Sequence, residues 1–221
     1  MKMVGCFTLI LGRVKVGSKL AKIVRQKLKT DSFKGVIFDL DGVIIKASLD
    51  FGLIAGEIFG SASKKPVLEG IKELSHAAER KKAFRILEKH EKRAALGAQL
   101  TPGIDELLEL IKRRGMKTAI VTRNTQDSVG IILEKFHLQI DCIVTRETAP
   151  PKPSKEPVLR ACECMGLNPH EVVFLGDYEF DMLAGERAGV VTVLLRSSKE
   201  STSENADLEI DSIAELVEMF F

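Results

Sequence analysis

The sequence contains no apolar run close to the roughly 20 residues that a membrane-spanning helix needs. It also contains no internal repeat and no low-complexity segment. Its 221 residues, 45% of them hydrophobic, are enough to bury a core as one domain, or as one domain with an insertion. We therefore expect a globular chain without a membrane span.

Cysteine is scarce, with four residues at Cys6, Cys142, Cys162 and Cys164. Four cysteines do not form a disulfide framework in a chain of this length. Cys162 and Cys164 lie two residues apart on a predicted helix and so point to different sides, and no histidine stands at ligand spacing beside them. We expect buried thiols and a reducing compartment.

Acidic residues are absent from residues 1–30, which hold eight lysines and arginines, so the remainder of the chain carries about −6. That negative balance argues against a nucleic-acid-binding surface. The basic leader has apolar residues at helical spacing: Leu20, Ile23, Val24 and Leu28. It resembles a mitochondrial transit peptide, and the alternative is a solvated arm or an extra helix lying on the domain. No small-residue cleavage pattern follows the apolar segment 4–11. These features favour an intracellular protein, cytoplasmic or mitochondrial, rather than a secreted one.

Strand and helix patterns alternate along most of the chain, which predicts an α/β fold with a doubly wound, Rossmann-like parallel sheet. Thr101 and Gly115 are expected to bound one helix, and a capping box at 212–215 opens the last one. The expected strands are 35–38, 117–122, 140–145, 171–175 and 190–195. The expected helices are 102–114, 128–138, 156–165, a short one ending at 188, and a final one from 213.

Residues 46–100 interrupt this alternation, because they contain helical patterns at 51–59, 67–76 and 78–95 and no convincing strand. We interpret the chain as a leader (1–33), a core (34–45 and 101–221) and a small helical cap (46–100) inserted after the first strand. The cap has two interpretations, a lid that excludes water and selects substrate or a set of helices merely packed on the sheet. Its position beside the first strand end favours the lid.

Asp39 and Asp41 directly follow the buried strand 35–38. Two carboxylates this close are costly at a strand end unless positive charge lies between them, and a divalent cation is the simplest compensation. Gly42 then allows a sharp turn beside a bound anion. The pattern predicts a metal-dependent site in which one aspartate attacks and the other moves a proton.

Three further strands end in polar residues that parallel-sheet geometry brings to the same edge. Thr122 ends one of them and is followed by Arg123, Lys152 follows another, and Asp177 ends a third, with Asp181 four residues later. Together with the two aspartates, these residues supply a nucleophile, a proton carrier, a hydroxyl, an ammonium and metal-binding carboxylates. Phosphoryl transfer requires that set.

This arrangement resembles the haloacid dehalogenase-like hydrolase superfamily over roughly residues 34–218. All four of its motifs are present in order, at 39–43, Thr122, Lys152 and 176–181. The sequence around Thr122 and Lys152 looks like the phosphoglycolate phosphatase-like branch, while 39–44 also looks like β-phosphoglucomutase. Asp41 argues for a phosphate ester over a haloacid, because dehalogenases of the superfamily lack it. The common Gly-Thr is Gly42-Val43 here, at a position that mostly packs.

The resemblance implies a role for each residue. Asp39 attacks phosphorus and forms an aspartyl-phosphate, and Asp41 acts as general acid and then as general base. Mg²⁺ is held by Asp39, the backbone carbonyl of Asp41 and Asp177. Thr122 binds a phosphate oxygen with help from backbone N–H groups near Arg123, and Lys152 neutralises developing charge. Asp181 supports the site by orienting Lys152 or a metal-bound water.

Several of these residues have simpler interpretations. Asp177 or Asp181 alone would suit a helix N-cap, and the Arg123 side chain would suit a surface salt bridge. Lys155 is a rival to Lys152 but is expected to face solvent, and Arg146 is expected on the surface.

The predicted function is a Mg²⁺-dependent phosphatase acting on a small phosphorylated metabolite. The alternatives are a phosphomutase of the β-phosphoglucomutase type and a catalytically silent binding or regulatory module with the same fold. The sequence determines neither the substrate nor the oligomeric state.

Overall fold

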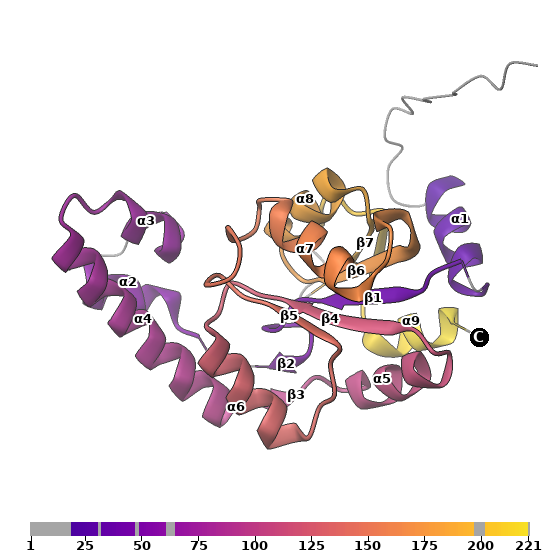
Figure 1. Ribbon diagram of the computed structural model, residues 1–221, viewed down its shortest axis with the longest axis horizontal. Coiled ribbons are helices and arrows are strands. Elements are labelled where there is room, and N and C mark those ends of the chain that lie inside the picture. The colour runs from indigo at the N-terminus through magenta and orange to yellow at the C-terminus, as the bar shows by residue number, and fades with distance from the viewer. Residues whose placement is uncertain (1–18, 31, 47–48, 61–64, 197–201, 221) are drawn as a thin grey trace, which may run out of the picture.

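The computed structural model of the chain describes residues 19–30, 32–46, 49–60, 65–196 and 202–220. Its centre is a six-stranded sheet with the order β5-β4-β1-β6-β7-β8, in which all neighbours run parallel (Figure 1). The strands are β1 (Gly35–Phe38), β4 (Lys117–Val121), β5 (Cys142–Val144), β6 (Val172–Gly176), β7 (Val191–Leu195) and β8 (Leu208–Ile210). The predicted doubly wound α/β architecture is confirmed.

Helices cover both faces of this sheet, with α7 and α8 on one side and α5 and α9 on the other (Figure 1). Strand β1 shows why, because its side chains alternate between two hydrophobic clusters: Val36 and Phe38 point into one, and Ile37 points into the other. The helices of this part of the chain are α5 (Ile104–Arg113), α6 (Gln126–Phe136), α7 (Glu156–Met165), a 3-10 turn (Pro169–Glu171), α8 (Glu179–Ala188) and α9 (Ile213–Met219).

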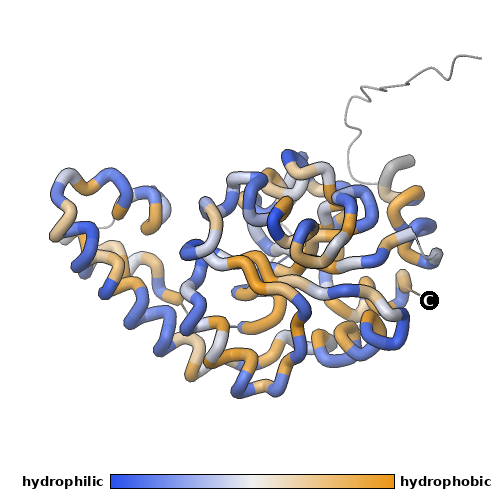
Figure 2. The backbone as a smooth tube through the Cα atoms, in the orientation of Figure 1, coloured by the Kyte–Doolittle hydropathy of each residue, from blue (hydrophilic) through white to orange (hydrophobic). Residues whose placement is uncertain are grey.

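Three helices follow the first strand and share a hydrophobic cluster of their own: α2 (Phe51–Phe59), α3 (Val67–Glu73) and α4 (Ala77–Gly97). Helix α2 begins where the Asp50 side chain accepts a hydrogen bond from the Leu53 N–H, and it ends at Gly60 in the left-handed region. The strands of the central sheet are mainly orange in Figure 2, whereas α4 carries long blue stretches. In Figure 1, α2, α3 and α4 lie together at one end of the molecule, beyond the central sheet.

Two short strands join these helices to the rest of the chain. Strands β2 (Ile45–Lys46) and β3 (Gln99–Leu100) form an antiparallel pair. The expectation of no strand in 46–100 is therefore wrong at both ends of that segment, because two-residue strands leave no periodic pattern to detect. Strand β8, which is only three residues long, was missed for a similar reason.

Helix α1 (Lys19–Leu28) places Val24 and Leu28 in the main hydrophobic cluster. The carbonyl of Leu28 also accepts a hydrogen bond from the Arg114 guanidinium at 3.0 Å. The part of the basic leader within the described residues is thus a helix packed on the domain, as one of the two interpretations predicts. Residues 1–18 lie outside the described residues.

The predicted start of α5 is wrong. Its N-cap is Gly103, with a φ of 85°, rather than Thr101. Thr101 is buried, and its hydroxyl has no hydrogen-bond partner within the described part of the chain. Glycine takes over the cap because it adopts the left-handed conformation without steric cost.

The prediction for the cysteines is also wrong for one pair. Cys142 on β5 and Cys164 near the end of α7 form a disulfide, with their Cα atoms 6.2 Å apart. Cys162, two residues away, remains a buried thiol, and Cys6 lies outside the described residues. Cys162 and Cys164 do point to different sides of α7. Cys164, the exposed one, bonds to Cys142 of β5. None of the helices in the described ranges is long and apolar enough to cross a membrane.

Candidate active site

The candidate site lies at the carboxyl ends of β4, β1 and β6, which are neighbours in the sheet. Phe38, the last residue of β1, pairs with Ile120 on one side and Leu175 on the other. Asp39 follows Phe38 directly, so it lies between the ends of the two flanking strands. The Asp39 N–H donates to the Leu175 carbonyl at 2.9 Å, which fixes where its side chain leaves the sheet.

Gly42 makes room for Asp177. Its φ is +79°, and a Cβ atom built on it would lie 1.9 Å from the Asp177 Oδ2 atom. A side chain at residue 42 would thus collide with the carboxylate, in addition to the cost of the left-handed backbone. The first and fourth sequence motifs are therefore in direct contact.

Lys152 connects three elements through one buried ammonium group, in a residue that is 2% exposed. The Nζ atom lies 2.6 Å from Asp39 Oδ1, 2.6 Å from Asp181 Oδ1 and 2.9 Å from the Val121 carbonyl oxygen. Burial alone would lower the pKa of Lys152, but the carboxylates of Asp181 and Asp39 outweigh it, so the pKa is raised. The group therefore carries a positive charge beside Asp39. The rival Lys155 is exposed at the N-cap of α7.

Asp181 is buried in the first turn of α8 and serves two groups at once. One carboxylate oxygen contacts Lys152, and the other accepts a hydrogen bond from the Tyr178 N–H at 3.1 Å. It therefore combines the N-terminal capping role and the lysine-orienting role that the sequence left as alternatives.

Three carboxylates gather here: oxygen atoms of Asp39, Asp177 and Asp181 lie within 4.8 Å of one another. Burial raises the pKa of Asp39 well above its usual value, against the lowering effect of Lys152. Burial, followed by the charge of Asp181, raises the pKa of Asp177 to about 7. A single ammonium does not balance three carboxylates, and oxygen ligands are what Mg²⁺ prefers, so the residues fit a divalent cation.

The Asp41 carboxylate is not part of this group. Its Oδ2 atom accepts a hydrogen bond from the side-chain amide of Asn124 at 2.7 Å. Asn124 also donates its backbone N–H to Thr122 Oγ1 at 3.1 Å, so this one residue contacts both Asp41 and Thr122. Asn124 had no predicted role, although it follows Thr122 by only two residues. Burial raises the pKa of Asp41, against that hydrogen bond and the charge of Lys152, which favours a carboxyl able to hold a proton.

Arg123 reaches across to the helical insertion. Its Nη2 atom donates to both carboxylate oxygens of Glu69 on α3, at 2.9 and 2.7 Å, and its Nη1 atom donates to the Lys152 carbonyl at 2.8 Å. The guanidinium also lies over the Phe180 ring, 4.9 Å from its centroid. The side chain thus makes a salt bridge at the mouth of the site.

The expectation that Arg146 is a surface residue is wrong. Its side chain is 7% exposed and pairs with Glu91 of α4, whose side chain is 3% exposed. Neither partner was identified as important from the sequence, because α4 is dense in charge and Glu91 resembles its solvent-facing neighbours.

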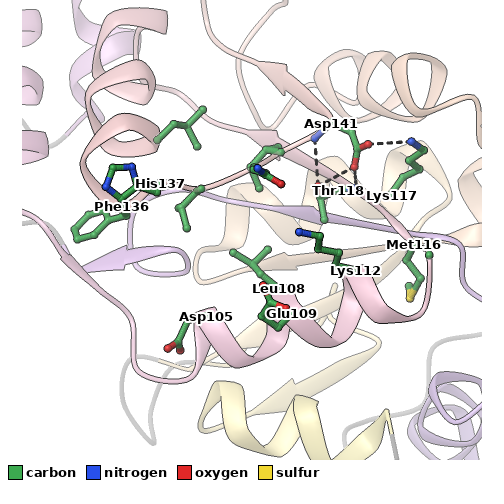
Figure 3. Close-up of a pocket in the computed structure, with 15 residues that line it drawn as sticks. Asp105, Leu108, Glu109, Lys112, Met116, Lys117, Thr118, Phe136, His137 and Asp141 are labelled. Carbon is green, nitrogen blue, oxygen red and sulfur yellow. Dashed lines mark hydrogen bonds and ion pairs between the residues drawn. The ribbon is translucent and has the colours of Figure 1, made fainter.

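A separate open groove of about 880 Å³ lies at the opposite, amino ends of β4 and β5, between α5 and α6 (Figure 3). Its most prominent charged group, Asp141, accepts hydrogen bonds from Lys117 and Thr118, as the dashed lines show. These groups are paired with one another, and none belongs to the predicted site.

Comparison with known proteins identifies the family of the chain. Residues 36–195 match the family described as haloacid dehalogenase-like hydrolase. The chain is 28% identical over 200 residues to a haloacid dehalogenase-like hydrolase domain-containing protein of Arabidopsis thaliana, covering 83% of this chain and 82% of that protein. It is 28% identical over 203 residues to a phosphoglycolate phosphatase of Aquifex aeolicus, covering 83% of this chain and 95% of the relative.

The fold recurs in solved structures. CbbY from Rhodobacter sphaeroides, determined in complex with phosphate, matches with a TM-score of 0.66 at 20% identity, covering 83% of this chain and 96% of that one. At that identity the similarity concerns the arrangement of helices and strands.

Proposed function

The chain belongs to the haloacid dehalogenase-like hydrolase family, and we propose that it is a phosphatase that hydrolyses a small phosphorylated metabolite through Asp39. The observation that carries the proposal is the environment of this residue. Asp39 meets the Lys152 ammonium at 2.6 Å and two further carboxylates within 4.8 Å, while Asp41 lies outside that group and accepts a hydrogen bond from Asn124. Two aspartates two residues apart are thereby given different surroundings and different tasks.

In the first step, a carboxylate oxygen of Asp39 attacks phosphorus as the bond to the leaving oxygen breaks. The Asp41 carboxyl gives its proton to that oxygen, so an alcohol departs and an aspartyl-phosphate remains. In the second step, Asp41 takes a proton from water as the water oxygen attacks phosphorus. Inorganic phosphate leaves, and the Asp39 carboxylate and the Asp41 proton are restored.

Positive charge and hydrogen-bond donors stabilise the phosphoryl group during both steps. Lys152 places its ammonium beside Asp39, and Thr122 offers a hydroxyl at the end of the neighbouring strand. When bound by Asp39, the backbone carbonyl of Asp41 and Asp177, Mg²⁺ would supply charge that offsets repulsion between Asp39 and the incoming phosphate. Asp181 supports the site through its contact with Lys152.

The helical segment 46–100 acts in this proposal as a cap that covers the strand ends and selects the leaving group. Its support is the Glu69 carboxylate on α3, which meets Arg123 directly beside Thr122. The relative named phosphoglycolate phosphatase indicates one candidate substrate class, small phosphorylated acids.

A panel of phosphate monoesters tests the function. The purified protein in Mg²⁺ should release inorganic phosphate from at least one of them without forming a bisphosphate, and Asp39→Asn should reduce turnover by roughly a thousandfold or more while leaving the fold intact. The matched control is Asp105→Asn, an exposed residue on α5. Asp39→Asn as active as the parent would refute the nucleophile assignment, and transfer of the phosphoryl group to a sugar phosphate would indicate a phosphomutase.

The compartment is a separate proposal. The acid-free, basic residues 1–30 support a mitochondrial or cytoplasmic location. Fusing residues 1–33 to a fluorescent reporter tests it, because a transit peptide directs the reporter to mitochondria and a diffuse signal removes that interpretation.

A further inference from the structure

The buried pair of Glu91 and Arg146 joins the helical segment to the core. Glu91 lies in the second half of α4, and Arg146 lies two residues beyond the end of β5. Arg146 Nη1 contacts Glu91 Oε1, with the two side chains 7% and 3% exposed. No other charge pair between the helical segment and the core is as deeply buried among the described residues.

This pair holds the loop that follows β4. The Nη1 atom of Arg146 also donates to the Arg123 carbonyl at 2.8 Å, and the Arg146 N–H donates to the Asn124 carbonyl at 3.4 Å. The backbone of Thr125 lies close enough to Glu91 to lower its pKa. Three consecutive loop residues, 123–125, are therefore contacted by two residues from outside the loop: Arg146, through its side chain and its backbone N–H, and Glu91.

Asn124 is the residue that this loop presents to the candidate proton donor. Its backbone is held by Arg146, and its side-chain amide donates to Asp41 Oδ2 at 2.7 Å. The contacts run without a break from Glu91 through Arg146 and Asn124 to Asp41. A change at Glu91 would thus alter the orientation of the Asp41 carboxyl without any direct contact.

Stability alone does not explain this pair. Desolvation of two buried charges offsets much of their attraction, and well-packed apolar residues commonly serve stability equally well. Here the Oε2 atom of Glu91 and the Nη2 atom of Arg146 have no hydrogen-bond partner within the described ranges. Burial also raises the pKa of Glu91 to about 7. Burying these two charges costs free energy, and what the pair provides in return is a fixed position for the loop after β4.

We propose that Glu91 and Arg146 are positioning residues that set Asn124 against Asp41 and so align the proton donor with the leaving oxygen. The inference rests on the proposed function, and it gives α4 of the helical segment an indirect part in proton transfer, through Arg146 and Asn124. It also distinguishes the two salt bridges to the core: Glu69 binds the Arg123 side chain, whereas Glu91–Arg146 contacts the backbone of the loop whose Asn124 binds the proton donor.

The test uses leaving groups that differ in their need for a proton. An alkoxide leaving from 2-glycerophosphate must be protonated, whereas the phenolate of p-nitrophenyl phosphate leaves readily without a proton. General-acid catalysis contributes roughly 10²–10⁴-fold. Glu91→Gln should therefore lower kcat for the glycerol ester by about tenfold or more, and kcat for the aryl ester by less than about threefold, with little change in KM.

Matched variants separate positioning from general damage. Glu79→Gln, an exposed change on the same helix, should leave both esters unaffected. Arg146→Lys keeps the charge, but its side chain ends one bond short of the Nη1 atom that donates to both Glu91 and the Arg123 carbonyl, so it should repeat the selective loss. Asn124→Ala should do the same, and combining it with Glu91→Gln should add little, because both changes act through one contact.

Each outcome decides the matter. An equal loss for both esters, or no loss, in folded Glu91→Gln and Arg146→Lys would overturn the inference and leave the phosphatase proposal standing. A wild-type protein that hydrolyses neither these esters nor any other monoester in Mg²⁺ would refute the proposed function itself.

Discussion

Gly42 gives the sharpest prediction at the scale of a single residue. In Gly42→Ala, the new methyl group would lie 1.9 Å from Asp177 Oδ2 on a backbone with a φ of +79°. Asp177 must move away, so Mg²⁺-dependent kcat/KM should fall about 10- to 100-fold, the usual effect of displacing a group at a metal site. Steady-state assays at several Mg²⁺ concentrations measure this loss.

Gly130 provides the matched control. It lies on the exposed side of α6, and nothing stands within 4 Å of the position of an added Cβ. Gly130→Ala should leave activity unchanged and stabilise the protein by roughly 0.5–1 kcal/mol through helix propensity. If Gly42→Ala were as active as Gly130→Ala, the close approach to Asp177 would have no functional consequence.

Glu91 predicts a pH dependence of stability. Its pKa is about 7 in the folded protein and 4.5 ordinarily, so between these values the folded state retains a proton that the unfolded state has released. Its contribution to the free energy of unfolding is therefore full below pH 4.5 and falls, by about 3 kcal/mol, as the pH rises to 7. Urea unfolding of wild type and Glu91→Gln measures it.

As the pH rises from 4.5 to 7, the free energy of unfolding of the wild type should fall relative to that of Glu91→Gln. Glu79→Gln should instead follow the wild type at every pH, because its side chain is exposed. Parallel curves for wild type and Glu91→Gln would contradict a buried, proton-retaining Glu91.

Sequence reasoning identified the residues whose chemical type is unusual for their place. Asp39 and Asp41 follow an apolar strand, where a carboxylate needs an explanation, and Lys152 lies in a proline-rich loop at another strand end. It did not identify Glu91 or Arg146, because each has many charged neighbours in sequence and is distinguished only by burial. Burial on a charged helix depends on tertiary packing, which local patterns do not contain.

At the scale of elements, α1 is the clearest case in which packing adds to a pattern. Leu28 is fully buried in the main cluster, so Leu28→Ala should lower the free energy of unfolding by about 2–5 kcal/mol through lost burial and a cavity. Ile23, on the same helix, is 42% exposed, and Ile23→Ala should cost less than about 1 kcal/mol. Urea denaturation compares the two. Equal, small effects would show that α1 adds nothing to the stability of the domain.

Long elements were predicted better than short ones for a physical reason. Helix α7 ends at Gly166 as expected, because a left-handed C-cap and a periodic apolar face are both local signals. Strands β2, β3 and β8 are two or three residues long and depend on partners distant in sequence. The Cys142–Cys164 disulfide was missed for the same reason, since it requires β5 and α7 to be neighbours in space.

At the scale of the whole molecule, charge links the helical segment to the core along its length. Lys92 on α4 meets Asp127 on α6 at 2.8 Å, and Lys135 of α6 donates to the carbonyls of Leu96 and Ala98 at 2.6 and 2.8 Å. The exposed pair contributes little by itself, whereas the contacts together orient α4 along α6. Helix α4 can then present Glu91 to the core at a fixed place.

The acidic cluster makes a prediction for the stability of the whole chain. Asp39, Asp177 and Asp181 repel one another in a buried setting, so a cation that binds the folded state should stabilise it. At a hundredfold excess over its Kd, Mg²⁺ adds about 2.7 kcal/mol, which raises the Tm of a domain of this size by about 5–10 °C. Thermal unfolding in EDTA and in Mg²⁺ measures the shift, and phosphate release should disappear and return with it.

Asp177→Asn should reverse the order of stabilities. Burial raises the pKa of Asp177 to about 7, so near neutral pH its charge is costly without a cation, and the neutral amide removes that cost. In EDTA the variant should therefore melt no lower than the wild type, whereas in Mg²⁺ it should melt lower because it loses the shift. Asp105→Asn should respond to Mg²⁺ as the wild type does. If Mg²⁺ did not change the Tm of the wild type, or raised the Tm of Asp177→Asn by the same amount, these carboxylates would not hold the cation.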